Sequence, residues 1–136
     1  MNPGSSQAAQ ALCASAELAE RGRAKVWNVL EYGRPARAFA LRFEGVVRAY
    51  LNRCAHVPAE LDWQPGEFLD IDRRWIVCSI HGATYEPADG LCVGGPCRRG
   101  RLISLDVDES SGQVYWYPSR DIQPAAFDAP AEESPQ

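Results

Sequence analysis

Residues 54–56 read Cys-Ala-His and residues 78–81 read Cys-Ser-Ile-His, and these two short boxes decide how the whole chain is interpreted. Residues two apart in an extended loop point to the same side, so each box offers one thiol and one imidazole together. The chain of 136 residues has only two histidines, His56 and His81, and each lies within three residues of a cysteine. Thiolate and imidazole ligands suit an iron–sulfur, zinc or copper site, and they do not suit magnesium or calcium.

Stretches with strand character surround both boxes. Residues 46–52 end just before the first box and residues 75–77 just before the second, so the boxes are expected on loops at strand ends. Further strands are predicted over residues 24–32, 36–43, 68–71, 102–107 and 113–117. Glu44-Gly45 and residues 108–112 are typical hairpin turns. Short, evenly spaced strands predict an all-β domain built from antiparallel sheets.

The chain divides into three parts by composition. Residues 1–23 read as a leader with a short Ala-rich helix, residues 24–117 as the domain, and residues 118–136 as a flexible acidic tail rich in Pro and Ala. Hydrophobic residues make up 46% and charged residues 24%, which is ordinary for a globular protein.

Charge and hydropathy exclude several classes of function. The net charge of −4 gives no basic surface for nucleic acid. The sequence has neither an apolar run long enough to cross a membrane nor a signal-peptide core, so we expect a cytoplasmic protein without membrane insertion. The five cysteines are an odd number, which argues against a disulfide scaffold and favours metal or redox chemistry.

Structural zinc is the main alternative among metals. Zinc sites usually group like ligands, with Cys-x₂₋₄-Cys followed by His-x₃₋₅-His. Here the order alternates between cysteine and histidine, which fits zinc less well.

The residues after the second box carry a family resemblance. Gly82-Ala83-Thr84-Tyr85 continues that box, and residues 86–90 with Gly94-Gly95-Pro96 are similar to the turn and proline loop of Rieske proteins. Over residues 24–117 the sequence resembles the Rieske 2Fe-2S family. The resemblance implies stacked antiparallel sheets, a small cluster-binding subdomain over about residues 52–100, and one Rieske-type 2Fe-2S cluster per chain. The 21 residues between the boxes exceed the usual gap, which predicts an extra hairpin around residues 61–72.

The resemblance also implies a ligand set. Cys54 and Cys78 bind the inner iron, and His56 and His81 bind the outer iron. Neutral imidazoles in place of two thiolates make the cluster less negative, which raises its reduction potential relative to a four-cysteine cluster.

Around these ligands the resemblance assigns a second set of residues. Gly82 permits close approach of the backbone, while Ala83 stands where high-potential relatives place a serine and so offers no donor. Tyr85 either donates to a ligating sulfur or packs as a strand aromatic. Gly95 and Pro96 belong to the loop that shields the cluster.

Features that are missing indicate the subclass. Respiratory Rieske proteins carry a membrane anchor and a disulfide whose cysteines would fall at Ala59 and Ile80, and Rieske oxygenases need additional histidines. The resemblance therefore implies a ferredoxin-type one-electron carrier, not an enzyme, that passes electrons from a flavin-dependent reductase to an oxygenase or another redox acceptor. An electron-transfer subunit or a redox-sensing module of a larger complex remains the alternative.

Two further groups have two interpretations each. Arg98, Arg99 and Arg101 form either a docking patch for an acidic partner or a solvated turn. Cys92 and Cys97 are either a disulfide across the proline loop or two reduced thiols, and in a reducing cytoplasm we favour the thiols.

Overall fold

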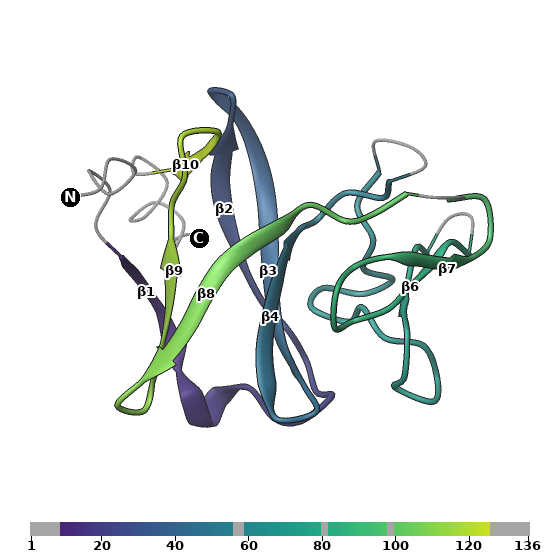
Figure 1. Ribbon diagram of the computed structural model, residues 1–136, viewed down its shortest axis with the longest axis horizontal. Coiled ribbons are helices and arrows are strands. Elements are labelled where there is room, and N and C mark those ends of the chain that lie inside the picture. The colour runs from purple at the N-terminus through teal and green to yellow at the C-terminus, as the bar shows by residue number, and fades with distance from the viewer. Residues whose placement is uncertain (1–8, 56–58, 80–81, 98–99, 126–136) are drawn as a thin grey trace.

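The computed structural model describes residues 9–55, 59–79, 82–97 and 100–125. Its strands in this part of the chain are β1 (Gln10–Ala14), β2 (Lys25–Glu31), β3 (Arg34–Phe43), β4 (Val46–Leu51), β5 (Ile76–Val77), β6 (Thr84–Tyr85), β7 (Cys92–Gly94), β8 (Ser104–Ser110), β9 (Gln113–Tyr117) and β10 (Ile122–Pro124). They form a seven-stranded and a three-stranded sheet, and neighbouring strands pair antiparallel (Figure 1). The predicted all-β fold with stacked antiparallel sheets is confirmed.

The large sheet folds over itself at β8. Its strand order is β1-β9-β8-β4-β3-β2-β10. The first residues of β8, Ser104 and Leu105, pair with β4, whereas residues 106–110 pair with β9. This change of partner places β1 and β9 opposite β2 to β4, with an apolar core between the two layers. That core holds Cys13, Val29, Ala38, Ala40, Leu51, Val114 and Trp116.

Strand β3 is covered on both faces. Phe39, Leu41 and Phe43 belong to a second core, shared with the region around the small sheet, whereas Ala38 and Ala40 face the first. Successive side chains of a strand point to opposite faces, so a strand between two cores carries an almost continuous apolar run. The large sheet therefore forms the platform on which the region around the small sheet packs.

The small sheet, in the order β5-β6-β7, lies beside the large one in Figure 1. Before it, the chain makes a hairpin in which Leu69 pairs with Ile76 and the Asp70 carbonyl accepts from the Arg73 amide across the turn. This hairpin joins the strands predicted at residues 68–71 and 75–77. Within residues 61–72, where we expected an extra hairpin, the structure has a tight turn in which Gln64 and Glu67 form an isolated antiparallel bridge.

The N-terminal prediction of a short helix is wrong over the described residues. Gln10–Ala14 forms β1 and pairs with β9, and only a 3-10 turn, Ser15–Glu17, follows. Short Ala-rich helices are marginal in water. Pairing with β9 instead buries Cys13 and Leu18 in the first core, and this burial outweighs local helix preference.

The folded domain continues beyond residue 117, where the composition suggested that the flexible tail begins. Ile122–Pro124 forms β10 at the edge of the large sheet beside β2, and Ile122 is buried in the first core. The remainder of the predicted tail, residues 126–136, lies outside the described residues. Within the described ranges no helix has the length and apolar character that a membrane span requires.

A half-buried arginine holds the N-terminal segment against the sheets. The Arg42 guanidinium donates to both carboxylate oxygens of Glu109 at 3.0 and 2.7 Å, and to the carbonyls of Leu18 and Ser15. This hydrogen bonding from Arg42, followed by that from Ser15, holds the pKa of Glu109 below its ordinary value.

The depressed pKa of Glu109 predicts a pH-dependent contribution to stability. It is present above the unfolded pKa near 4.5 and is lost as the pH falls through the lower folded value. We expect Glu109→Gln to lower the free energy of unfolding by about 1 kcal/mol at pH 7, after allowance for solvent screening. The difference from wild type should shrink below about pH 4. Urea unfolding of both proteins from pH 7 to below about pH 4 measures the difference in free energy of unfolding. A difference that does not change with pH would contradict a stabilising role of the ionised Glu109 carboxylate.

Candidate metal centre

The first predicted ligand loop leaves β4 and turns back on itself. The Cys54 amide donates to the Ala59 carbonyl at 2.8 Å, so the loop closes immediately after the cysteine. The Cys54 side chain is only 2% exposed and belongs to the second core. The closed turn and the core together therefore keep the Cys54 thiol out of contact with water.

The second predicted ligand loop repeats this arrangement after β5. The Cys78 amide donates to the Ala83 carbonyl at 2.8 Å, and the Gly82 amide donates to the Cys78 carbonyl at 3.0 Å. Cys78 is also 2% exposed and belongs to the same core as Cys54. Neither cysteine is in a disulfide, and the two thiols are buried in one core.

Tyr85 on β6 links its hydroxyl to the first loop. The hydroxyl oxygen accepts from the Ala55 amide at 2.9 Å and lies 3.3 Å from Cys54 Sγ. Burial, followed by the hydrogen bond to Cys54, raises the pKa of Tyr85 above its ordinary value, so the hydroxyl keeps its proton. Either group could donate in this contact while Cys54 is a thiol. A thiolate can only accept, so Tyr85 is the expected donor once Cys54 binds the cluster.

We expect Tyr85→Phe to lower the midpoint potential. A donor to sulfur stabilises the extra negative charge of the reduced state by roughly 1 kcal/mol, which corresponds to a fall of about 40 mV for one electron. A spectroscopic redox titration measures the shift. The matched control is Tyr50→Phe, because Tyr50 is buried in the same core but donates to the Pro87 carbonyl at 2.6 Å. Equal potentials in Tyr85→Phe and wild type would contradict the role of this hydroxyl.

The loop after β7 packs directly on the second ligand loop. A Cβ atom at Gly95 would lie 2.9 Å from Ala83 Cα and 2.9 Å from the Gly82 carbonyl oxygen, and Gly95 itself has a φ of +81°. The Ala83 side chain is completely buried, whereas Pro96 and Gly82 are exposed. The loop therefore abuts the backbone of Gly82 and Ala83 in the second ligand loop.

Cys92 and Cys97 form a disulfide across this loop, and our preference for two reduced thiols is wrong. Their Cα atoms are 5.8 Å apart, within the range that a disulfide spans. Backbone hydrogen bonds set this distance, because the Cys92 amide donates to the Gly100 carbonyl and the Gly100 amide donates to the Cys97 carbonyl. The expectation of reduced thiols in a reducing cytoplasm did not take account of how close the fold brings these two cysteines.

Four of the predicted site residues lie outside the described residues, namely His56, His81, Arg98 and Arg99. Arg101 is exposed and forms an isolated bridge with Leu91. In the part of the chain that the structure describes, no group of three or more His, Cys, Asp or Glu side chains is arranged to hold a metal ion.

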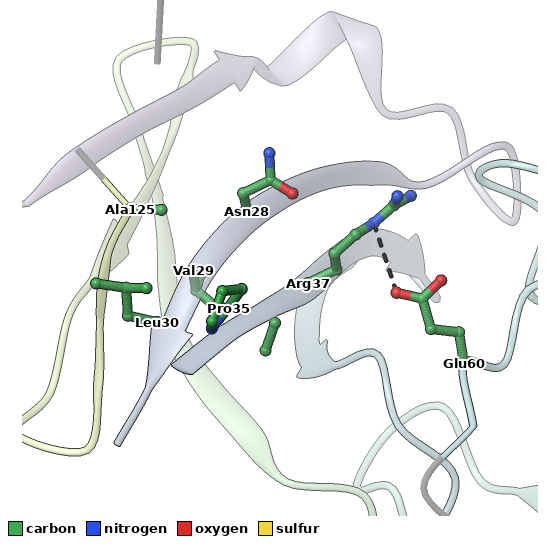
Figure 2. A pocket seen from close by; sticks show the side chains of 8 residues that line it. Asn28, Val29, Leu30, Pro35, Arg37, Glu60 and Ala125 are labelled. Atoms are coloured by element: carbon green, nitrogen blue, oxygen red, sulfur yellow. Dashed lines mark ion pairs between the residues drawn. The ribbon is translucent and has the colours of Figure 1, made fainter. Parts of the chain in front are cut away.

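A groove of about 350 Å³ lies beside the first ligand loop (Figure 2). Arg37 on β3 points toward Glu60, with 3.7 Å between Nε and Oε2, and this ion pair links the loop to the large sheet (Figure 2). Both side chains are about half exposed, so the pair contributes little stability. The remaining lining residues are Asn28, Val29, Leu30, Pro35, Ala36 and Ala125. These described lining residues include no nucleophile paired with a base.

A comparison with protein families decides the assignment. The family model of the Rieske [2Fe-2S] domain matches residues 8–118. The chain belongs to the Rieske [2Fe-2S] domain family. A Rieske domain holds a 2Fe-2S cluster, so this chain carries a Rieske-type 2Fe-2S cluster. The match begins at residue 8, so the family's fold includes β1, which our leader prediction had left outside.

Solved structures show the same fold. The chain is similar to the terminal oxygenase of carbazole 1,9a-dioxygenase from Novosphingobium sp. KA1, with 25% identity and a TM-score of 0.63, over 87% of this chain and 31% of that chain. It is also similar to a chain in a fluorene-bound oxygenase and ferredoxin complex of carbazole 1,9a-dioxygenase, with 21% identity and a TM-score of 0.65, over 82% of this chain and 29% of that chain.

A third similar structure has a shorter chain. It belongs to the complex of reduced oxygenase and oxidized ferredoxin in carbazole 1,9a-dioxygenase, with 22% identity and a TM-score of 0.63, over 82% of this chain and 94% of that one. The Rieske chain described here thus spans less than a third of the first two structures and nearly all of the third. No curated protein sequence matches it.

The described residues of this Rieske domain fit the cluster. The thiols of Cys54 and Cys78 lie buried in one core, and the Tyr85 hydroxyl oxygen lies 3.3 Å from the sulfur of Cys54. A thiolate pair with a hydrogen-bond donor is the environment that a Rieske centre requires on its cysteine side.

Sequence reasoning missed two features of the site. The Cys92–Cys97 disulfide had a signal in the five-residue separation of its cysteines, which we interpreted the other way. The buried Asn52 had none, because an asparagine at a strand end is ordinary.

Proposed function

We propose that this Rieske domain is a one-electron carrier of the ferredoxin type. The observation that carries the proposal is its match to 94% of a chain in an oxygenase and ferredoxin complex. When bound, the cluster accepts and releases one electron at a time.

The proposed ligands are Cys54 and Cys78 on the buried side and His56 and His81 on the outer side. The residues around the cysteines hold the site dry and fixed. The Ala83 carbonyl accepts from the Cys78 amide, and Gly95 packs on the backbone of Gly82 and Ala83. The Tyr85 hydroxyl lies 3.3 Å from the sulfur of Cys54 and is the proposed donor to it.

The proposed acceptor is an oxygenase, since two of the similar structures are oxygenase and ferredoxin complexes. The proposed donor is a flavin-dependent reductase. Arg98, Arg99 and Arg101 remain candidates for steering an acidic partner, an effect that weakens as salt rises.

Stopped-flow reduction tests the proposal. The purified protein, loaded with its cluster, is mixed with a flavin-dependent ferredoxin reductase and NADH, and then with a Rieske oxygenase. We expect full reduction by one electron per chain, followed by reoxidation in the presence of the oxygenase. A protein that takes up no electron from the reductase, or holds zinc without inorganic sulfide, would overturn the proposal.

A second candidate is an electron-transfer domain within a larger enzyme or a redox-sensing module. The similar chains of which this one covers only 29% and 31% favour it, because they contain the same fold within a longer protein. Purification from the native source separates the two functions. A carrier elutes alone, whereas a subunit elutes in a fixed ratio with its partner.

A further inference from the structure

The two ligand loops are joined by hydrogen bonds that start at one buried asparagine. Asn52 is 5% exposed, and apart from tyrosine and cysteine it is the only polar residue buried in the described ranges. The backbone amide of Asn52 donates to the Arg37 carbonyl, which fixes this residue to β3. It lies two residues before Cys54, at the point where the chain leaves the sheet for the first ligand loop.

The Asn52 side chain closes that loop. Its Oδ1 accepts from the Leu61 amide at 2.7 Å, and its Nδ2 donates to Asp62 Oδ1 at 3.1 Å. The other carboxylate oxygen of Asp62 accepts from the Gly66 amide at 3.3 Å. A rotated amide group would set an N–H against an N–H and an oxygen against a carboxylate, so the contacts define one orientation.

The same peptide segment reaches the second loop. The Leu61 carbonyl accepts from the Ser79 amide at 3.2 Å, and Ser79 directly follows Cys78. Leu61 is completely buried in the core that holds both cysteines. A continuous series of bonds therefore runs from the sheet through Asn52 and Leu61 to the residue beside Cys78.

We propose that Asn52 is the positioning residue that sets the two ligand loops relative to one another. The chain has Ala59 and Ile80 where an interloop disulfide would need cysteines, so the loops lack that covalent link. Asn52 supplies its noncovalent counterpart. A buried amide whose oxygen and nitrogen each have a partner favours one geometry, because turning it away breaks both bonds. The inference rests on the 2Fe-2S cluster of the family and not on which proteins donate and accept the electron.

A charge-conserving swap tests the role without making a cavity. Asn52→Asp keeps the acceptor for the Leu61 amide but sets a carboxylate against Asp62. Asn52→Asp combined with Asp62→Asn restores one donor and one acceptor between the two side chains. Each protein is loaded with its cluster. The electron paramagnetic resonance spectrum of the reduced protein and the rate of iron loss to a chelator are then recorded.

We expect Asn52→Asp to change the g-values and to release iron at least tenfold faster, and the double variant to recover both properties. The control is Asn28→Ala, an exposed asparagine on β2, which should match wild type.

Wild-type spectra and release rates in Asn52→Asp would overturn the proposal. Failure of the double variant to recover the spectrum would also overturn it. If Asn52→Asp does not take up a cluster, recovery of uptake in the double variant decides in favour, and no recovery decides against. Because reduction by a partner enzyme is not measured, failure here leaves the carrier function unaffected.

Discussion

In Cys54→Ala and Cys78→Ala, we expect protein that binds no 2Fe-2S cluster. Each substitution removes a thiolate that no other described cysteine can replace, because Cys92 and Cys97 form a disulfide and Cys13 lies in the first core. Metal binding contributes to folding, so the loops around the missing ligand should also become susceptible to protease. Iron and acid-labile sulfide analysis of the purified variants, with the visible spectrum, measures the loss.

Two controls separate ligand loss from loss of a buried thiol. Cys13→Ala removes a thiol that is 7% exposed and whose pKa is raised by burial, and it should keep the whole cluster. The double variant Cys92→Ala/Cys97→Ala removes the disulfide and should also keep it, because neither sulfur is a proposed ligand. Full iron and sulfide content in Cys54→Ala or Cys78→Ala would contradict the ligand assignment.

The second large effect is expected at Gly95. At a φ of +81° any other residue costs about 1–2 kcal/mol. The added Cβ would also lie 2.9 Å from Ala83 Cα, so backbone must move on one side or the other. We expect Gly95→Ala to lower the stability of the loop by at least about 2 kcal/mol, which makes iron loss to a chelator roughly thirtyfold faster if the loop opens first.

The neighbouring glycine is a matched control. A Cβ at Gly94 would meet only Thr84 Cβ, at an ordinary contact distance of 3.8 Å, and Gly94 has no positive φ. Gly94→Ala should therefore release iron at the wild-type rate, measured under the same chelator concentration. If the two alanine variants lose iron equally fast, close packing of Gly95 on the second ligand loop does not protect the site.

Much of the fold follows from local sequence. Glu44-Gly45 and Ser111-Gly112 form tight turns with positive φ at both positions, and such turns join antiparallel neighbours wherever the rest of the chain lies. The alternating boxes at residues 54–56 and 78–81 likewise indicated a metal site from residue type and spacing, because thiols and imidazoles are paired in both. The resemblance to the Rieske family then specified the 2Fe-2S cluster.

Tertiary structure decided the rest, wherever a residue's role depends on a partner far along the chain. An Ala-rich segment becomes β1 because β9 offers it an edge about 100 residues away, and β10 joins β2 in the same way. The Tyr85 hydroxyl meets the first ligand loop because the fold brings it to the Ala55 amide, 30 residues away along the chain. Asn52 links two loops through Leu61 only once the fold brings the Ser79 amide to the Leu61 carbonyl. Local preference is worth tenths of a kcal/mol per residue, whereas burial and completed hydrogen bonds are worth about 1 kcal/mol or more each, so the long-range contacts determine these features.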